Sequence, residues 1–180
     1  MLSLIPKVPG VDLITQFQRI ALINVIFKIV FKAFASRLDP MTNKVISHTQ
    51  ITFIKGRHIL DGALSILENV HEIRVKKLGG ILLKLDFEKA YDRVNWSFLI
   101  EVLRWKGFDA GYIYKVKQLV SGGQTAISIN GEIGPYFRNR RGMRQGDPLS
   151  PLLFNFVGEA LAAMLSAANS AGTSKGWPRI

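Results

Sequence analysis

The stretch that decides the fold is ILLKLDFEKAYDRVNW, residues 81–96. It opens with a short apolar run, interrupted only by Lys84, and then presents the carboxylate of Asp86. A buried strand that ends in an acid holds a carboxylate at the rim of a sheet, where a hard cation can reach it. The pattern also fits an acid that caps a strand or begins a turn, so this stretch alone leaves both interpretations open.

A second stretch, GMRQGDPLSPLLF at residues 142–154, adds a specific motif. The two stretches, in this order and at this separation, resemble the first and second palm motifs of a reverse transcriptase of the non-LTR (LINE-type) kind. QGDPLSP is highly specific to that polymerase superfamily. Three flanking segments are similar to plant LINE elements: IPK at 5–7, LINVIFKIVFKAFASRL at 22–38 and FIKGRHILDG at 53–62. The resemblance therefore covers nearly the whole chain.

The resemblance implies an α/β (α+β) fold, with right-hand polymerase fingers and part of a palm whose antiparallel sheet packs on helices. We expect a single truncated reverse transcriptase domain. Residues 1–80 would be mainly fingers, and residues 81–180 would begin the palm and carry an inserted fingers hairpin. The sequence itself contains no internal repeat and no linker that would divide the chain.

Composition points to a polyanionic partner. The formal net charge is +11 and the sequence pI is about 10.1, and nucleic acid is the commonest partner of such a chain. A basic protein that touches ribosomes or acidic lipids is the alternative. The absence of cysteine excludes disulfide scaffolds, thiolate zinc sites and cysteine nucleophiles. Lys28 and Lys32 break the most apolar stretch, residues 21–35, so we expect no membrane partner.

Local signals predict the main elements. The first fifteen residues are rich in turn formers and fit a loop or hairpin. Residues 22–38 follow a helical pattern that should end at Asp39-Pro40, because the residue before proline is pushed out of the helical region. Residues 125–137 read as a hairpin around a type I′ turn at Asn130-Gly131. The buried side of the 22–38 helix is predicted to consist of Val25, Ile26, Ile29, Val30, Ala33, Phe34 and Leu38.

Capping residues mark three further helix starts. Asp61 is the expected N-cap of a helix that turns Leu64, Leu67, Val70 and Ile73 inward before Gly79-Gly80. Asn95 should cap a helix that Gly107 closes. Ser150 should cap a long apolar helix with Pro151 as its first residue, lying beneath the palm sheet.

The resemblance also assigns roles at the site. Asp86 would be the first carboxylate, and the backbone carbonyl of Phe87 the second ligand, for Mg²⁺ (or Mn²⁺). Tyr91 would stack under the sugar and exclude a 2′-hydroxyl. Gln145 would reach the incoming nucleotide, and Gly146 would permit close approach of the backbone. Asp147 is expected to cap a turn, not to bind metal.

Basic residues are the expected contacts to nucleic acid. Arg138, Arg140, Arg141 and Arg144 crowd into seven residues beside the glutamine motif, a density that favours phosphate contact. Lys7 matches the family lysine that reaches the triphosphate, although a solvated surface lysine explains it equally. Arg57 matches a fingers motif, and either a phosphate contact or a structural role fits it.

The chain departs from the family pattern twice. The usual arginine-proline pair that binds triphosphate is replaced by Gln18-Arg19. No adjacent aspartate pair occurs, and no aspartate follows Asp147. One carboxylate cannot hold two magnesium ions against water.

We therefore interpret the chain as an RNA-directed DNA polymerase domain cut before its catalytic centre is complete, and inactive in isolation. Its partners would be an RNA template, a DNA primer and deoxynucleoside triphosphates. Two alternatives stay open: a non-enzymatic nucleic-acid-binding remnant, and a relic without a stable fold. A nuclear location follows only from the family's habit of copying at chromosomal targets.

Overall fold

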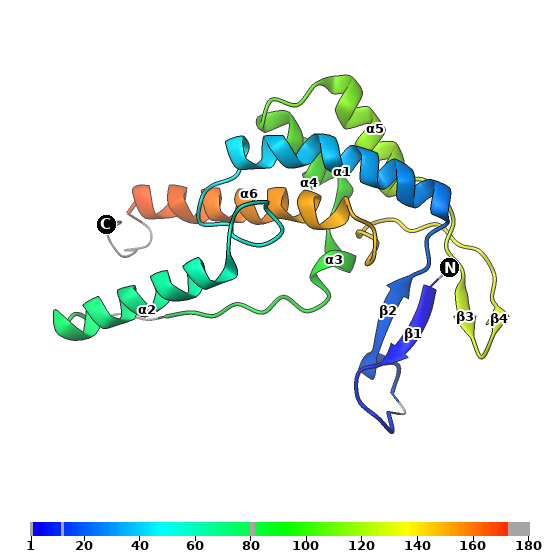
Figure 1. Ribbon diagram of the computed structural model, residues 1–180, viewed down its shortest axis with the longest axis horizontal. Coiled ribbons are helices and arrows are strands. Elements are labelled where there is room, and N and C mark those ends of the chain that lie inside the picture. The colour runs from blue at the N-terminus through cyan, green and yellow to red at the C-terminus, as the bar shows by residue number, and fades with distance from the viewer. Residues whose placement is uncertain (1, 12, 80–81, 173–180) are drawn as a thin grey trace.

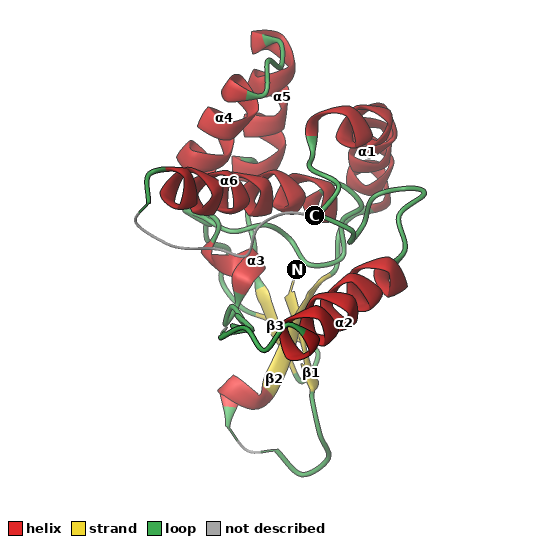
Figure 2. Cartoon of the chain, turned by 90° about the vertical axis from the view of Figure 1, so that its left-hand side faces the viewer, coloured by secondary structure: helices red, strands yellow, loops and turns green. Residues whose placement is uncertain are grey.

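Helices form one end of the molecule and a small sheet the other. The computed structural model describes residues 2–11, 13–79 and 82–172. In Figures 1 and 2 the sheet lies below one end of a group of four helices. These are α1 (Val25–Val45), α4 (Trp96–Trp105), α5 (Ala110–Ser121) and α6 (Ser150–Ser170). The predicted mixed α/β class is confirmed.

The sheet joins the first part of the chain to a segment far along the sequence. Its strand order is β2-β1-β3-β4, with β1 at Leu2–Pro6, β2 at Phe17–Ala21, β3 at Ile127–Ile129 and β4 at Glu132–Ile133. β1 pairs antiparallel with β2 and parallel with β3, so that Leu2 lies opposite both Ala21 and Ile127. The sheet is therefore mixed, and it consists of segments that the resemblance assigned to the fingers.

Both predicted hairpins are present. The N-terminal segment folds back on itself as β1 and β2, with a short 3₁₀ helix, η1 (Ile14–Gln16), between them. The β3–β4 turn places Asn130 and Gly131 at φ 52° and 86°. Positive φ at both central residues is what a type I′ turn demands.

The core lies between the helices. Buried apolar side chains meet there from α1, α4, α5 and α6: Phe31, Ala35, Leu38, Leu99, Val102, Leu103, Ile113, Val116, Leu152, Leu153 and Phe156. Fully removing such side chains from water stabilises a fold by roughly 1.5–3 kcal/mol each. Helices therefore supply most of the buried core.

Helix α1 differs from its prediction in length and in orientation. It continues through Pro40 to Val45 instead of ending at Asp39. Its buried stripe is Phe31, Ala35, Leu38 and Thr42, whereas Val25, Ile26 and Ile29, predicted to be inside, are exposed. An internal proline costs about 3 kcal/mol, and the complete burial of Leu38 and Thr42 on either side of Pro40 offsets that cost.

Helix α2 (Ile59–Val75) also differs from its prediction. It begins after His58, so Asp61 lies inside the first turn and is not the N-cap. Leu64 and Leu67, predicted to face inward, are exposed. Helix α2 therefore has no fully buried residue, and the predicted inward face is not formed.

The other two predicted caps had different outcomes. The side chain of Asn95 accepts a hydrogen bond from the backbone N–H of Phe98 at 3.2 Å, as an N-cap should, and Gly107 follows α4 at φ 80°. Ser150 was wrongly predicted as a cap, because it is already the first residue of α6. By length and composition α6 could cross a membrane, but core helices pass the same test, and its Leu153 and Phe156 are fully buried.

The described part of the predicted central strand, residues 82–85, forms no strand, and residue 81 lies outside the described residues. Residues 82–87 have no regular secondary structure, and every one of them is exposed. A strand needs a hydrogen-bonded neighbour, and none of the described residues supplies one. The segment leads into a short helix, α3 (Ala90–Arg93), through the left-handed backbone of Lys89 at φ 53°.

Candidate nucleotide and nucleic-acid site

The carboxylate of Asp86 is presented to solvent. Asp86 lies on the exposed segment just before α3, and the side chain of Phe87 beside it is exposed as well. The Asp86 carboxylate and the backbone carbonyl of Phe87 are therefore both on accessible chain. The prediction that they bind a cation stays a prediction.

Tyr91 packs against the long helix α6. Its ring stacks on Phe154 with centroids 4.9 Å apart and planes inclined by 13°. Burial, and then the nearby carboxylate of Asp147, raise the pKa of the Tyr91 hydroxyl. Phe154 therefore covers one face of the Tyr91 ring, and a ligand could contact only the other face or the hydroxyl.

Two backbone hydrogen bonds join the two sequence motifs. Gly142 N–H donates to Val94 O, and Met143 N–H donates to Tyr91 O, each at 2.8 Å. Trp96 Nε1 also donates to Gly142 O at 2.7 Å. The loop at residues 142–149, called here the glutamine loop because it carries Gln145, is therefore hydrogen-bonded directly to α3 and its C-cap, which follow Asp86.

The position of Gly142 requires glycine. Its φ is +90°, and a Cβ atom there would lie 2.7 Å from Asp92 O. Left-handed backbone and a contact this close both exclude a side chain. The close approach of the two motifs depends on this residue.

Gln145 lines a cavity of about 430 Å³. Its backbone oxygen accepts a hydrogen bond from Ala21 N–H at 3.1 Å, which ties the loop to the end of β2. Other walls come from the start of α1 at Asn24 and from the glycines that follow α5. Asp92 and Arg141 also line the cavity, but Asp86 does not.

Asp147 caps the turn that leads into α6, as predicted. One of its carboxylate oxygens accepts from Leu149 N–H at 2.8 Å and from Ser150 N–H at 2.6 Å. The buried Asp147 thus satisfies amides that a helix start leaves without intrahelical partners. Both oxygens of this carboxylate are already hydrogen-bonded within the protein.

Arg144 is turned inward, unlike the other arginines of its cluster. Its guanidinium donates to Leu119 O at 3.1 Å and to Gly122 O, and lies 5.7 Å from the ring centroid of Phe31. Burial lowers its pKa, and the Asp147 carboxylate opposes that effect. These contacts fit a structural role.

The remaining cationic candidates are exposed. Arg138, Arg140 and Arg141 are solvent-accessible on the connection between β4 and the glutamine loop, and Lys7 is exposed just after β1. Exposed guanidinium groups at successive positions can neutralise the phosphates of a nucleic acid. Gln18 is exposed too, on β2 opposite Ile5.

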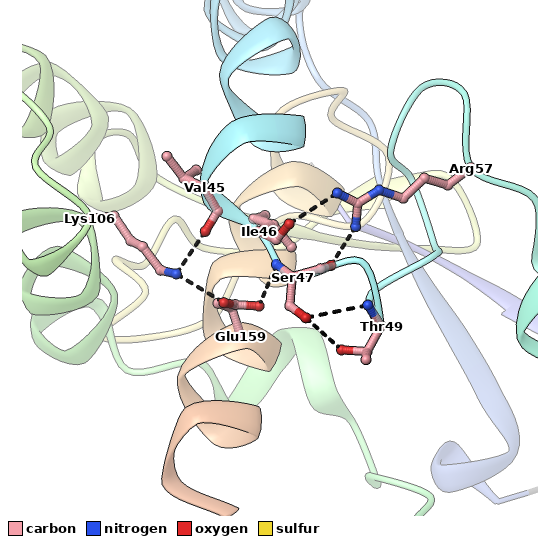
Figure 3. Close-up of polar contacts among 7 residues, drawn as sticks. All are labelled: Val45, Ile46, Ser47, Thr49, Arg57, Lys106 and Glu159. Atoms are coloured by element: carbon pink, nitrogen blue, oxygen red, sulfur yellow. Dashed lines mark hydrogen bonds and ion pairs between the residues drawn. The ribbon is translucent and has the colours of Figure 1, made fainter. Parts of the chain in front are cut away.

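Arg57 is hydrogen-bonded to backbone carbonyls of the loop that follows α1 (Figure 3). Its guanidinium donates to Ile46 O at 3.0 Å and also to Ser47 O and Gln50 O. Of the two roles that the sequence left open, the structural one accounts for these contacts.

Sequence reasoning missed a partly buried ion pair beside Arg57. Lys106 Nζ lies 2.9 Å from Glu159 Oε1 and also donates to Val45 O at 2.7 Å, while Glu159 Oε2 accepts from Ser47 N–H at 3.0 Å (Figure 3). The signal was a lone glutamate in an otherwise apolar stretch of α6. The pair joins α4 and α6 to the end of α1.

The described residues do not make a complete divalent-metal centre. Among residues 2–11, 13–79 and 82–172, no group of three or more histidine, aspartate or glutamate side chains could hold an ion. Asp86 and the carbonyl of Phe87 could contribute to such a centre. They do not fit two ions on their own, because hard cations require six or more oxygen ligands.

Comparisons with known proteins agree with the motifs. The model of the family "Reverse transcriptase (RNA-dependent DNA polymerase)" matches residues 5–174. The transposon TX1 149 kDa protein of Xenopus laevis is 32% identical over 165 residues, which is 92% of this chain and 13% of that protein. The Pol polyprotein of the type-1 retrotransposable element R2 of Nasonia vitripennis is 28% identical over 162 residues, or 90% of this chain and 16% of that protein.

A shorter match covers the type-2 element R2DM of Drosophila melanogaster, whose Pol polyprotein is 37% identical over 81 residues, 45% of this chain and 8% of that protein. The chain thus spans less than a fifth of the length of each of these relatives. The family match, in contrast, covers nearly all of its 180 residues. The chain belongs to the reverse transcriptase (RNA-dependent DNA polymerase) family.

Proposed function

We propose that this chain is the fingers and the beginning of the palm of an RNA-directed DNA polymerase from a plant non-LTR, LINE-type retroelement. The observation that carries the proposal is the pair of backbone hydrogen bonds that joins the glutamine loop to α3 and its C-cap, which follow Asp86. The family match over residues 5–174 supports it. In this proposal residues 1–80 are mainly fingers, and a nuclear location follows.

The chain's own residues would bind and orient a nucleotide. Gln145, on a loop held at both sides, would contact the incoming deoxynucleoside triphosphate, and Lys7 would meet its phosphates. Tyr91, packed against Phe154, would lie under the sugar and exclude a nucleotide that carries a 2′-hydroxyl. Gly146, at φ +107°, lets the backbone approach closely.

Asp86 is the proposed binding site for divalent cations. Reverse transcriptases generally use divalent metal ions, and we propose Mg²⁺ (or Mn²⁺) here, with the Asp86 carboxylate and the Phe87 carbonyl among the ligands. Such ions supply charge stabilisation during nucleotide transfer. Since the described residues hold one such carboxylate, further ligands must complete the centre.

An RNA template and a DNA primer are the proposed macromolecular partners. The net charge of +11 favours a polyanion. Arg138, Arg140 and Arg141 form an exposed basic strip beside the glutamine loop, and we assign phosphate contacts to them. Arg57 and Arg144, which were also candidates, are engaged with backbone carbonyls.

Nucleotide selection tests the proposal. With a primer–template bound, we expect a deoxynucleotide complementary to the template base to bind more tightly than a mismatched one. Gln145→Ala should weaken the matched nucleotide by about tenfold, the effect of losing one hydrogen bond of about 1.4 kcal/mol. Fluorescence anisotropy of a labelled primer–template, titrated with each nucleotide, measures this. Gln124→Ala, on another wall of the same cavity, is the matched control.

The second candidate is a non-catalytic nucleic-acid-binding remnant, which the incomplete set of carboxylates favours. Such a remnant would bind primer–template without distinguishing nucleotides. Primer extension with magnesium or manganese addresses catalysis directly, and we expect residues 1–180 to incorporate nothing. Incorporation that Asp86→Asn abolishes would contradict this expectation and would eliminate the remnant hypothesis.

A further inference from the structure

The side chain of Arg144 connects the glutamine loop to two helices of the core. Its Nη1 atom donates to Leu119 O at 3.1 Å, and its Nη2 atom donates to Gly122 O. The guanidinium carbon lies 5.7 Å from the ring centroid of Phe31 on α1. One side chain therefore holds the loop against the end of α5 and against α1 at the same time.

The end of α5 is suited to a guanidinium group. Leu119 belongs to the last turn of α5, where carbonyl groups lack partners within the helix and carry a partial negative charge. Gly122 is the C-cap, and a Cβ atom on Gly123 would lie 3.3 Å from Arg144 Nη2. The glycines after α5 thus leave room for the cation. Because two different nitrogens donate to the two carbonyls, the planar fork of arginine suits this arrangement better than the ammonium of lysine.

Gln145, the next residue, is held by its backbone. Its carbonyl oxygen accepts a hydrogen bond from Ala21 N–H at 3.1 Å, at the end of β2. On the other side of Arg144, Met143 is buried and its N–H donates to Tyr91 O at 2.8 Å. The side chain of Arg144 adds an attachment to α5 immediately beside Gln145, and both residues line the cavity of about 430 Å³.

We propose that Arg144 is a positioning residue, which holds Gln145 where the Gln145 side chain meets the incoming nucleotide. This inference rests on the proposed function, which assigns the nucleotide contact to Gln145. Because both Nη atoms of Arg144 already donate to backbone carbonyls, Arg144 itself contacts neither the nucleotide nor the phosphates of a nucleic acid. The indirect role replaces the phosphate contact that the sequence predicted for this residue.

Other roles for Arg144 lead to different expectations. A phosphate contact would give Arg144 a share in the salt dependence of primer–template binding. A purely structural role would lower the stability of the whole chain without a selective effect on the nucleotide. Positioning predicts a loss of nucleotide affinity that disappears once the Gln145 side chain has been removed.

A double-mutant cycle on the whole chain with a bound primer–template tests the proposal. Arg144→Met, which keeps a long side chain but removes its donors, should weaken a matched deoxynucleotide by up to about tenfold, the whole effect expected of Gln145→Ala. In a chain that already carries Gln145→Ala, Arg144→Met should cause no further loss, since effects of coupled residues do not add. Fluorescence anisotropy gives all four affinities. Additive losses would overturn the proposal.

The salt dependence of primer–template binding separates positioning from phosphate contact. Arg144→Met should leave the slope of log affinity against log salt concentration unchanged. Arg140→Met is the matched comparison, because Arg140 is exposed in the same cluster, and it should reduce the slope by about one. A reduced slope in Arg144→Met would assign this residue to phosphate and contradict the proposal.

Amide exchange tests the attachment without a nucleotide. The Ala21 N–H that donates to Gln145 O should exchange faster in Arg144→Met than in the wild type. The control is the Gly134 N–H, which donates to Ile127 O at 2.9 Å and should not change. Arg144→Lys, which keeps the charge beside Phe31, is the milder variant and should show smaller effects in each measurement. An unchanged Ala21 amide, or an equal increase at Gly134, would overturn the proposal.

The proposed function and the role of Arg144 can fail separately. A wild type that binds matched and mismatched deoxynucleotides equally would reject the proposed function. A wild type that prefers the matched deoxynucleotide, with the same preference in both Arg144 variants, would reject only the role of Arg144.

Discussion

Replacing Glu159 by alanine is expected to lower the free energy of unfolding by about 2 kcal/mol, because its pair with Lys106 is partly buried and lies between exposed pairs, which contribute about 0–1 kcal/mol, and buried pairs, whose disruption costs about 3–5 kcal/mol. The Glu159 side chain is 12% exposed and joins three elements through Lys106 and the backbone N–H of Ser47. After the substitution, Lys106 keeps only Val45 O as a partner. The Ser47 amide loses its acceptor, and an unsatisfied buried donor costs about 1–3 kcal/mol.

Urea unfolding followed by circular dichroism measures this change as a shift in midpoint at constant slope. Glu101→Ala is the control, because Glu101 pairs with Arg104 in a largely exposed position. Exposed pairs contribute about 0–1 kcal/mol, so the control should shift little. Similar losses for both glutamates would show that burial of the Lys106 pair has no special effect.

Gly142→Ala is expected to cost about 3 kcal/mol or more, combining left-handed backbone strain with overpacking. The new Cβ would lie 2.7 Å from Asp92 O and 3.0 Å from Asp92 Cα, and neither backbone atom can rotate away. The loop would have to move, which would weaken the bonds from Gly142 to Val94 and from Met143 to Tyr91.

Gly131→Ala separates the cost of left-handed backbone strain from the cost of overpacking. Gly131 has nearly the same φ, +86°, but a Cβ there would meet nothing within 4 Å. Its substitution should cost only the left-handed strain, about 1–2 kcal/mol. Urea unfolding gives both losses, and amide exchange at Met143 reports the loop. Equal costs at the two glycines would show that the close approach to Asp92 is not constraining.

Local chemistry made part of this fold predictable. The Asn130-Gly131 turn, the Asn95 cap and the Asp147 cap each depend on a few neighbouring residues, and all three are present. The glutamine motif identified the family because its sequence is nearly unique to it. Such signals need no knowledge of the rest of the chain.

Features that depend on distant partners were not predictable in this way. The orientation of α1 is set by what packs on Phe31 and Leu38 from α4, α5 and α6, and a pattern of apolar residues all around a helix does not choose among faces. The strand expected before Asp86 needed a neighbour that the described residues do not provide. Helix α5 was left unassigned, although Ile113, Val116 and Val120 follow helical spacing.

The parallel pairing of β1 with β3 has a consequence for how the protein is made. Leu2 leaves the ribosome well before its partner Ile127, because α1, α2, α3, α4 and α5 lie between them in the sequence. Closing so long a loop is entropically costly and slow compared with helix formation. The N-terminal hairpin must therefore wait with one edge open until the second half of the chain arrives.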